Sequence, residues 1–227
     1  RLVQANLRFD NRTPEEFLRL VAEYRPDVMT LQEVSDLWAS KLQAIRSAYP
    51  HQLVCPGTNL IGGVAIVSRR PFVADSLSFC GKGGALAVQT VDFNGKWVTV
   101  ASIHLKWPWP HTQPQQLAAM QANFDAIAAA ERLTLIGGDM NAAPWSAAVE
   151  TIATSTGTHV LPQVRGTWLL PALPKSWVPF VGLPIDNILA GGLTIRMATS
   201  LRDFGSDHRP ILVEFTLPSN NLPIDES

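Results

Sequence analysis

Residues 2–34, LVQANLRFDNRTPEEFLRLVAEYRPDVMTLQEV, contain the signals of a strand, a helix and a second strand in succession. Thr13 is a suitable N-cap, Pro14 suits the first helical position, and Glu16 completes the pattern of a capping box. The run Val28–Leu31 after this helix is short and apolar, which is typical of a buried strand. The unit therefore predicts a sheet whose strands are connected through an outer helix.

Further strands and helices follow along the chain. The expected helices run from Asp36 to about Ala48, from Gln115 to Glu131, and for a short stretch after Pro144. The expected strands are Gln52–Cys55, Gly63–Ser68, Val73–Phe79, Leu86–Phe93, Trp97–Ile103, Leu133–Ile136, Ile185–Leu189, Leu193–Ala198 and Ile211–Leu217. Asn94-Gly95 predicts a tight hairpin, and residues 161–184, rich in Pro, Trp and Leu, predict a long irregular loop. Together these signals favour one mixed α/β (α+β) domain over residues 1–227, with helices outside packed sheets.

The composition excludes several classes of protein. Apolar residues make up 46% and charged residues 16%, which argues against a disordered chain, a coiled coil and a collagen-like fibre. No apolar run approaches the ~18 residues of a membrane span. The formal net charge of -1 argues against a strongly basic nucleic-acid module, although folding can gather a local basic patch. Cys55 and Cys80 leave two states open, one bridge or two free thiols.

Polar residues stand at the ends of the expected strands, where ligand and catalytic groups usually lie. They are Asn6, Glu33, His104, Asp139, Asn141, Asp186, Asp207 and His208. Each alone has a simpler interpretation as a cap, a turn residue or a half-buried histidine. As a set they favour a site, because such groups avoid burial unless they are paired or bound to a metal. Carboxylate and amide oxygens without thiols suit Mg²⁺ or Mn²⁺, and a hard cation with a histidine suits attack on phosphorus. The glycine-rich loops of nucleotide-dependent phosphoryl transfer are absent, and we interpret residues 81–84, GKGG, as a turn.

Six short motifs along the chain then indicate a family. They are Gln4-Ala5-Asn6-Leu7, Leu31-Gln32-Glu33-Val34, Ser102-Ile103-His104-Leu105, Gly138-Asp139-Met140-Asn141-Ala142-Ala143-Pro144, Ile185-Asp186-Asn187-Ile188 and Ser206-Asp207-His208-Arg209-Pro210. In this order they resemble the endonuclease/exonuclease/phosphatase superfamily of DNase I-like and exonuclease III-like hydrolases. The resemblance runs from Asn6 to Pro210 and implies a four-layer α/β sandwich of two packed mixed sheets flanked by helices. One position departs from the commoner pattern, since Asn187 follows Asp186 where the family often has an aromatic residue or histidine.

The resemblance implies a role for each site residue. It implies Glu33 as the main metal ligand, with Asn6 beside it and Asp207 as a further ligand, and Mg²⁺ or Mn²⁺ as the cofactor. It implies that His208 contacts the scissile phosphate and acts as base or transition-state stabiliser, while Asp186 orients its other ring nitrogen. Asp139 is expected to position or deprotonate the attacking water, Asn141 to stabilise the developing oxyanion, and His104 to lie near the leaving group. We also expect Arg69, Lys106 and Trp168 to contact the substrate.

The substrate class stays open at this stage. The first hypothesis is a Mg²⁺-dependent phosphodiesterase of nuclease type, with DNA as a candidate substrate. The second is a phosphomonoesterase or a sphingomyelinase-like phospholipid phosphodiesterase, and the third is a non-catalytic binding module on the same fold. We expect a monomer. The chain starts without Met and lacks a signal-peptide pattern, so we expect a domain from a longer chain, either the soluble part of a bacterial membrane-anchored protein or a cytoplasmic protein.

Two apolar loops leave from expected site residues. Trp107-Pro108-Trp109-Pro110 follows His104, and residues 169–184, with Trp177 and Phe180, lead into Asp186. Both loops are therefore expected to surround the same cleft. Two interpretations are open: the loops pack on each other as a lid, or they form an apolar rim that meets a membrane surface or stacks on bases.

Overall fold

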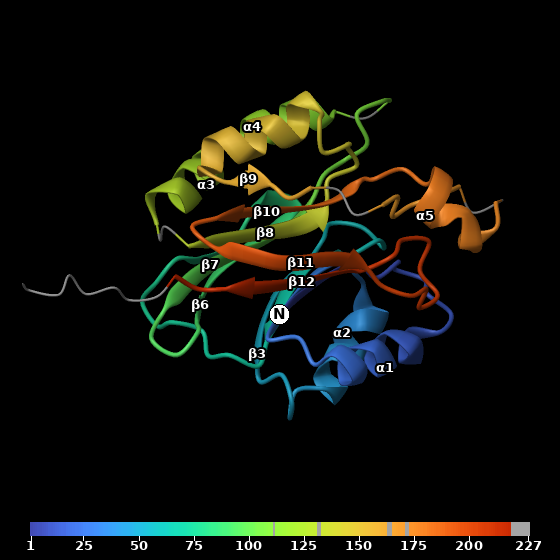
Figure 1. Ribbon diagram of the computed structural model, residues 1–227, viewed down its shortest axis with the longest axis horizontal. Helices are drawn as coiled ribbons and strands as arrows, with labels where there is room; N and C mark the ends of the chain where they lie inside the picture. Colours follow the sequence, from blue (N-terminus) through green and yellow to red (C-terminus); the bar gives the residue numbers. More distant parts are fainter. Residues whose placement is uncertain (111, 131–132, 163–164, 171–172, 219–227) are drawn as a thin grey trace, which may run out of the picture.

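The protein is a four-layer sandwich, as predicted. The computed structural model describes residues 1–218 except 111, 131–132, 163–164 and 171–172. Two six-stranded sheets pack face to face, with helices α1 and α2 on one outer side and α3 and α4 on the other (Figure 1).

The first sheet has the strand order β11-β12-β1-β2-β4-β3. Its strands are β1 (Leu2–Asn6), β2 (Val28–Val34), β3 (His51–Cys55), β4 (Gly63–Ser68), β11 (Thr194–Ser200) and β12 (Ile211–Thr216). β1 and β2 run parallel and are connected through α1, whereas β12 and β4 flank them in antiparallel orientation. The carboxyl ends of β1 and β2 therefore meet at one edge of this sheet.

The second sheet has the order β5-β6-β7-β8-β10-β9. Its strands are β5 (Ser78–Cys80), β6 (Leu86–Asp92), β7 (Trp97–His104), β8 (Thr134–Asp139), β9 (His159–Val160) and β10 (Asp186–Gly191). The parallel pair is β7 and β8, joined through α3, and β10 runs antiparallel to β8. The predicted hairpin at Asn94-Gly95 connects β6 and β7, and both turn residues have the positive φ that this turn demands.

The helices cover the sheets through three apolar clusters. They are α1 (Pro14–Tyr24), α2 (Asp36–Ala44), α3 (Gln113–Ala129), α4 (Ala147–Thr156) and the short α5 (Val178–Val181), with 3₁₀ turns at Lys82–Gly84 and Lys175–Trp177. One cluster packs α1 and α2 on the first sheet, one lies between the sheets, and one packs α3 and α4 on the second sheet. Within the described part of the chain, none of the helices combines the length and the apolarity that a membrane crossing requires.

Three local expectations were wrong or incomplete. The capping box at α1 does not form, because Asn11 Oδ1 accepts the hydrogen bond of the Thr13 backbone N–H and Glu16 pairs with Arg19 instead. The expected strand Val73–Phe79 is reduced to β5, because Asp75 has a positive φ and the chain turns there. The loop 161–184 contains α5, and the short strand β9 precedes it without having been predicted. The expected end of α3 at Glu131 lies outside the described residues.

Candidate active site

The predicted polar residues converge on one edge of the two sheets. Asn6 ends β1, and His104 and Asp139 end the parallel pair β7 and β8. Asp186 begins the antiparallel β10, where it pairs with Asp139 in the register of the sheet. His208 lies just before β12, the antiparallel neighbour of β1. Carboxyl ends of parallel strands and starts of antiparallel strands share an edge, so the topology gathers residues as distant in sequence as Asn6 and His208.

Glu33 reaches this edge through a β-bulge in β2. Met29 and Leu31 face the helices, and strict alternation would send residue 33 into the same apolar cluster. The register with β4 instead shifts between Gln32 and Val34, and Glu33 has a φ of 57°. Val34 thereby takes the next core position, and the half-buried Glu33 carboxylate is turned toward the cavity.

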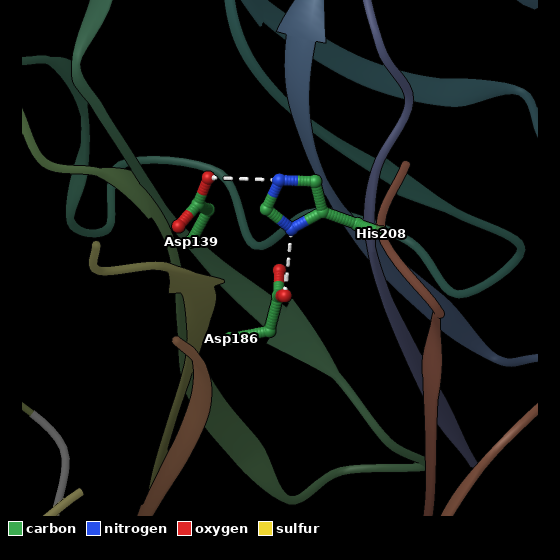
Figure 2. Close-up of side chains that lie close together, drawn as sticks. All are labelled: Asp139, Asp186 and His208. Atoms are coloured by element: carbon green, nitrogen blue, oxygen red, sulfur yellow. Dashed lines mark hydrogen bonds and ion pairs between the residues drawn. The ribbon is translucent and has the colours of Figure 1, made fainter. Parts of the chain in front are cut away.

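A chain of buried ionisable groups lies at the centre of the site (Figure 2). His208 Nδ1 lies 2.8 Å from Asp186 Oδ2, and His208 Nε2 lies 3.6 Å from Asp139 Oδ2. His104 Nε2 also lies 3.6 Å from the same Asp139 oxygen. The carboxylate of Asp186 thus orients the His208 ring, and Asp139 stands between two imidazoles.

The surroundings of these groups shift their pKa values. Burial alone disfavours a charged His208, but the adjacent Asp186 and Asp139 carboxylates overcome this effect and raise the pKa of His208 to about 10. Burial raises the pKa of Asp139, an effect that the nearby His208 only partly offsets. The imidazole is therefore held as a hydrogen-bond donor, and Asp139 is a better proton acceptor than a solvated aspartate.

Two glutamines that were not predicted as site residues support Asp186. Gln4 contacts Asp186 directly, and Gln32 contacts Gln4. Gln4 Nε2 donates to Asp186 Oδ1 at 2.9 Å and to Gln32 Oε1 at 2.8 Å, and Gln32 Nε2 donates to Ser102 Oγ at 2.9 Å. All four side chains are buried between the sheets. A glutamine inside each of two mostly buried strands, Gln4 in β1 and Gln32 in β2, was the available signal for this network.

Asn6 lies beside Glu33, as expected, and contacts two carboxylates of the site. Its Nδ2 donates to Glu33 Oε1 and to Asp139 Oδ2, each at 3.0 Å, while its Oδ1 accepts the backbone N–H of Arg8. The amide nitrogen of Asn6 therefore holds the Glu33 and Asp139 carboxylates together, while its oxygen keeps a second lone pair, so a metal contact of Asn6 stays a prediction.

The oxygen donors at the cavity fit a hard cation. Glu33 and Asp207 are half-buried, line the cavity and leave lone pairs of their carboxylates unused, with Glu33 Oε2 accepting from Phe9 N and Asp207 Oδ2 from the Trp168 indole. Asp139, Asp186 and His208 also lie close enough together to hold an ion. Both oxygens of Asp186 already take part in hydrogen bonds, however, so the Glu33 and Asp207 carboxylates offer the freer oxygen ligands for a cation.

The site residues surround a cavity of about 470 Å³. His104, Asn141, Lys106 and Trp168 line it, so the structure brings these four predicted residues together at one cavity. One amide hydrogen of Asn141 is bound to the Leu105 carbonyl at 2.7 Å, which leaves the other for a ligand. Arg69 does not belong here: its guanidinium pairs with Asp27 at the opposite end of β2 and β4, so its assignment to substrate binding was wrong.

The first apolar loop reaches the cavity through Trp107, and next to the second loop it is Trp168, the residue just before it, that lines the cavity. Trp107 and Trp168 contact each other with ring centroids 5.3 Å apart, and both line the cavity. Trp109 is 84%, Trp177 52% and Phe180 78% exposed. These three side chains do not pack as a lid, so of the two interpretations the exposed apolar rim fits the structure.

A second, apolar groove adjoins the cavity and shares Trp107 and Asn141 with it. Its volume is about 760 Å³. Prolines, alanines and leucines from the starts of α3 and α4 and from residues 183–185 line it, and no described residue of the lining is charged.

Comparison with known proteins agrees with this geometry. A model of the Endonuclease/Exonuclease/phosphatase family matches residues 3–208. The fold is similar to an AP endonuclease from Archaeoglobus fulgidus (16% identity, 95% of this chain and 99% of that chain, TM-score 0.74). It is also similar to D. rerio TDP2 complexed with single-strand DNA product (19%, 95% and 98%, 0.73) and to beta toxin from Staphylococcus aureus with bound magnesium ions (17%, 92% and 97%, 0.62). No curated protein matches the chain.

Proposed function

Because the chain belongs to the Endonuclease/Exonuclease/phosphatase family, we propose that its site hydrolyses a phosphodiester by attack of water on phosphorus. Membership makes the chain a metal-dependent phosphoric ester hydrolase. The observation that carries the finer proposal is the Asp186–His208–Asp139 chain at the cavity that Glu33 and Asp207 line.

In this proposal each residue of the site has a defined chemical role. Glu33 and Asp207 would hold Mg²⁺ or Mn²⁺, and such an ion would supply positive charge against the phosphoryl oxygens. Asp186 holds His208 Nδ1, so that Nε2 donates a hydrogen bond to a phosphoryl oxygen as negative charge develops there. Asp139 accepts the proton of the attacking water, and His104 lies across Asp139 on the side assigned to the leaving group. The remaining amide hydrogen of Asn141 stabilises the oxyanion.

Nuclease-type hydrolysis is the first form of this activity to test. A single-strand DNA product in the similar TDP2 structure supports it, as does Lys106 at the cavity. The bound magnesium ions of the similar beta toxin support Mg²⁺ as the cofactor. A phosphomonoesterase is a weaker alternative, because within the described lining Lys106 is the one Lys or Arg available for a dianionic phosphate.

The second candidate is a phosphodiester that carries an apolar group, such as a phospholipid at a membrane surface. The uncharged groove adjoins the cavity, so an apolar substituent of the phosphorus has a place to bind. Trp109, Trp145 and Phe180 are each more than three-quarters exposed, and aromatic residues are stable at a lipid–water interface.

A substrate panel with Mg²⁺ or Mn²⁺ tests both forms. It contains plasmid DNA, an abasic oligonucleotide, a bis-aryl phosphate, a mono-aryl phosphate and sphingomyelin vesicles. The proposal expects hydrolysis of at least one diester, loss of turnover in His208→Ala, and retained turnover in His159→Ala, whose exposed side chain lies on β9. Hydrolysis of the monoester alone, or turnover that His208→Ala leaves intact, contradicts it. Preference for sphingomyelin over DNA selects the second form.

A further inference from the structure

The Cys55–Cys80 disulfide joins the two sheets at the edge of the catalytic cavity. Cys55 ends β3 in the first sheet and Cys80 ends β5 in the second, with their Cα atoms 5.4 Å apart. Each cysteine leads directly into a loop that lines the cavity. Residues 56–62 contribute Thr58, Asn59, Ile61 and Gly62, and residues 81–85 contribute Gly83, Gly84 and Ala85. One side of the cavity, which we call the 56–62/81–85 wall, therefore consists of two loops with a disulfide at their base.

The two loops touch through their backbones. A Cβ atom placed on Gly84 would lie 2.2 Å from the Pro56 carbonyl oxygen, so no side chain fits between the loops. Gly84 also has a φ of 70°, which favours glycine. Contacts of this kind bury little apolar side-chain surface, so packing alone gives the wall little stability. The covalent bond is the strong connection between the loops.

Each loop is also attached to a residue of the proposed site. A Cβ on Gly62 would lie 2.2 Å from the Val34 carbonyl oxygen, next to the bulge that presents Glu33. In the second loop, the Ala85 carbonyl accepts the His104 backbone N–H at 2.9 Å. The wall thus connects the expected metal side of the cavity to the expected leaving-group side, and its position sets the distance across which a substrate binds.

We propose that the Cys55–Cys80 disulfide is a positioning element of the substrate cavity, and that its reduction weakens substrate binding while the domain stays folded. The activity readout of this inference rests on the proposed function. A dithiol reduces the bond to two thiols and is itself oxidised to a disulfide. Cys80 is exposed, so a reductant has access. Since disulfides persist in oxidising compartments, we expect the protein to have its full activity in such a compartment.

Kinetics of bis-aryl phosphate hydrolysis by the full chain test the inference. The chain has two cysteines, so dithiothreitol acts on this bond alone. Reduction is expected to raise KM about fivefold or more and to change kcat by less than about threefold. Cys55→Ala/Cys80→Ser should reproduce this result without reductant and should not respond to dithiothreitol. An unchanged KM in the reduced, folded protein overturns the proposal.

Amide hydrogen exchange provides a readout that does not depend on activity. Reduction should accelerate exchange in residues 56–62 and 81–85 and leave β1, β2 and β8 protected. Unchanged exchange in these loops overturns the proposal. If the oxidised protein hydrolyses no substrate of the panel, the proposed function fails, and exchange still decides the inference.

A second variant covers the case in which the reduced protein unfolds. Gly84→Ala forces the loops apart while the disulfide stays intact. Gly95→Ala is its matched control, because Gly95 also has a positive φ, at 84°, but its added Cβ meets nothing within 4 Å and the residue lies in the β6–β7 turn. A higher KM in Gly84→Ala than in Gly95→Ala supports the claim that the position of the 56–62/81–85 wall controls substrate binding. Equal KM values contradict this claim.

Discussion

Replacing Gln4 with Met removes the donor that holds Asp186 in place. Gln4 Nε2 is bonded to Asp186 Oδ1 and Gln32 Oε1, and its own Oε1 has no partner among the described residues. Met has a similar shape and no donor. The substitution therefore deprives two buried acceptors of this hydrogen bond, one of them charged.

The structure gives the size of the effect. A buried acceptor without its donor costs about 1–3 kcal/mol, and a charged one lies toward the upper end. Gln4→Met should therefore lower the free energy of unfolding by about 2–6 kcal/mol. If Asp186 also loses its fixed position, kcat should fall about tenfold, equivalent to about 1.4 kcal/mol of the activation barrier.

Urea unfolding and diester hydrolysis, measured on the same preparation, check both numbers. Gln89→Met is the matched control, because the buried Gln89 bonds to Ser78 and to the Thr90 carbonyl on β6, away from the site. The control should lose stability and keep its kcat. A stability loss below about 0.5 kcal/mol in Gln4→Met with an unchanged kcat would refute the reasoning.

Three further predictions concern metal, acid–base and surface residues. His208→Ala should lower turnover by about 10²- to 10⁴-fold. Adding Asp186→Ala should lower turnover little further, because the two residues act as a unit. Independent, multiplicative losses in steady-state kinetics would contradict the pairing. Glu33→Gln should weaken Mg²⁺ binding in calorimetry without unfolding the domain, and undiminished binding would show that Glu33 is not the principal ligand. Changing Trp109 and Trp177 together to Ser should leave thermal stability unchanged, since both side chains are exposed. The change should reduce the fraction of protein that sediments with anionic vesicles. A lowered melting temperature would indicate that the two side chains pack as a lid.

The fold was largely predictable because its signals are local. The strand–helix–strand unit, the Asn94-Gly95 hairpin and the limits of β4 all depend on residues near each other in sequence. The capping box at Thr13 failed because Asn11, outside the expected pattern, competes for the Thr13 N–H. The bulge at Glu33 was not predicted, because it depends on the core position that Val34 fills rather than on local preference.

The residues of the site were predictable as a set, and their contacts were not. Strand ends and the family motifs indicated the eight polar residues that the edge brings together. The contacts of Asn6 with Glu33 and Asp139, the pairing of Arg69 with Asp27 and the support of Asp186 by Gln4 depend on side chains from distant segments. The bond between Cys55 and Cys80 likewise depends on β3 and β5 meeting across the two sheets.

Hydrolysis of a bis-aryl phosphate in ¹⁸O-labelled water tests the central claim most directly. If a metal-assisted water attacks phosphorus, the aryl phosphate product gains one ¹⁸O atom per turnover and the phenol gains none. Chelation should stop hydrolysis and label incorporation until Mg²⁺ or Mn²⁺ is restored. Label in the phenol, or turnover that survives chelation, would contradict the proposed reaction.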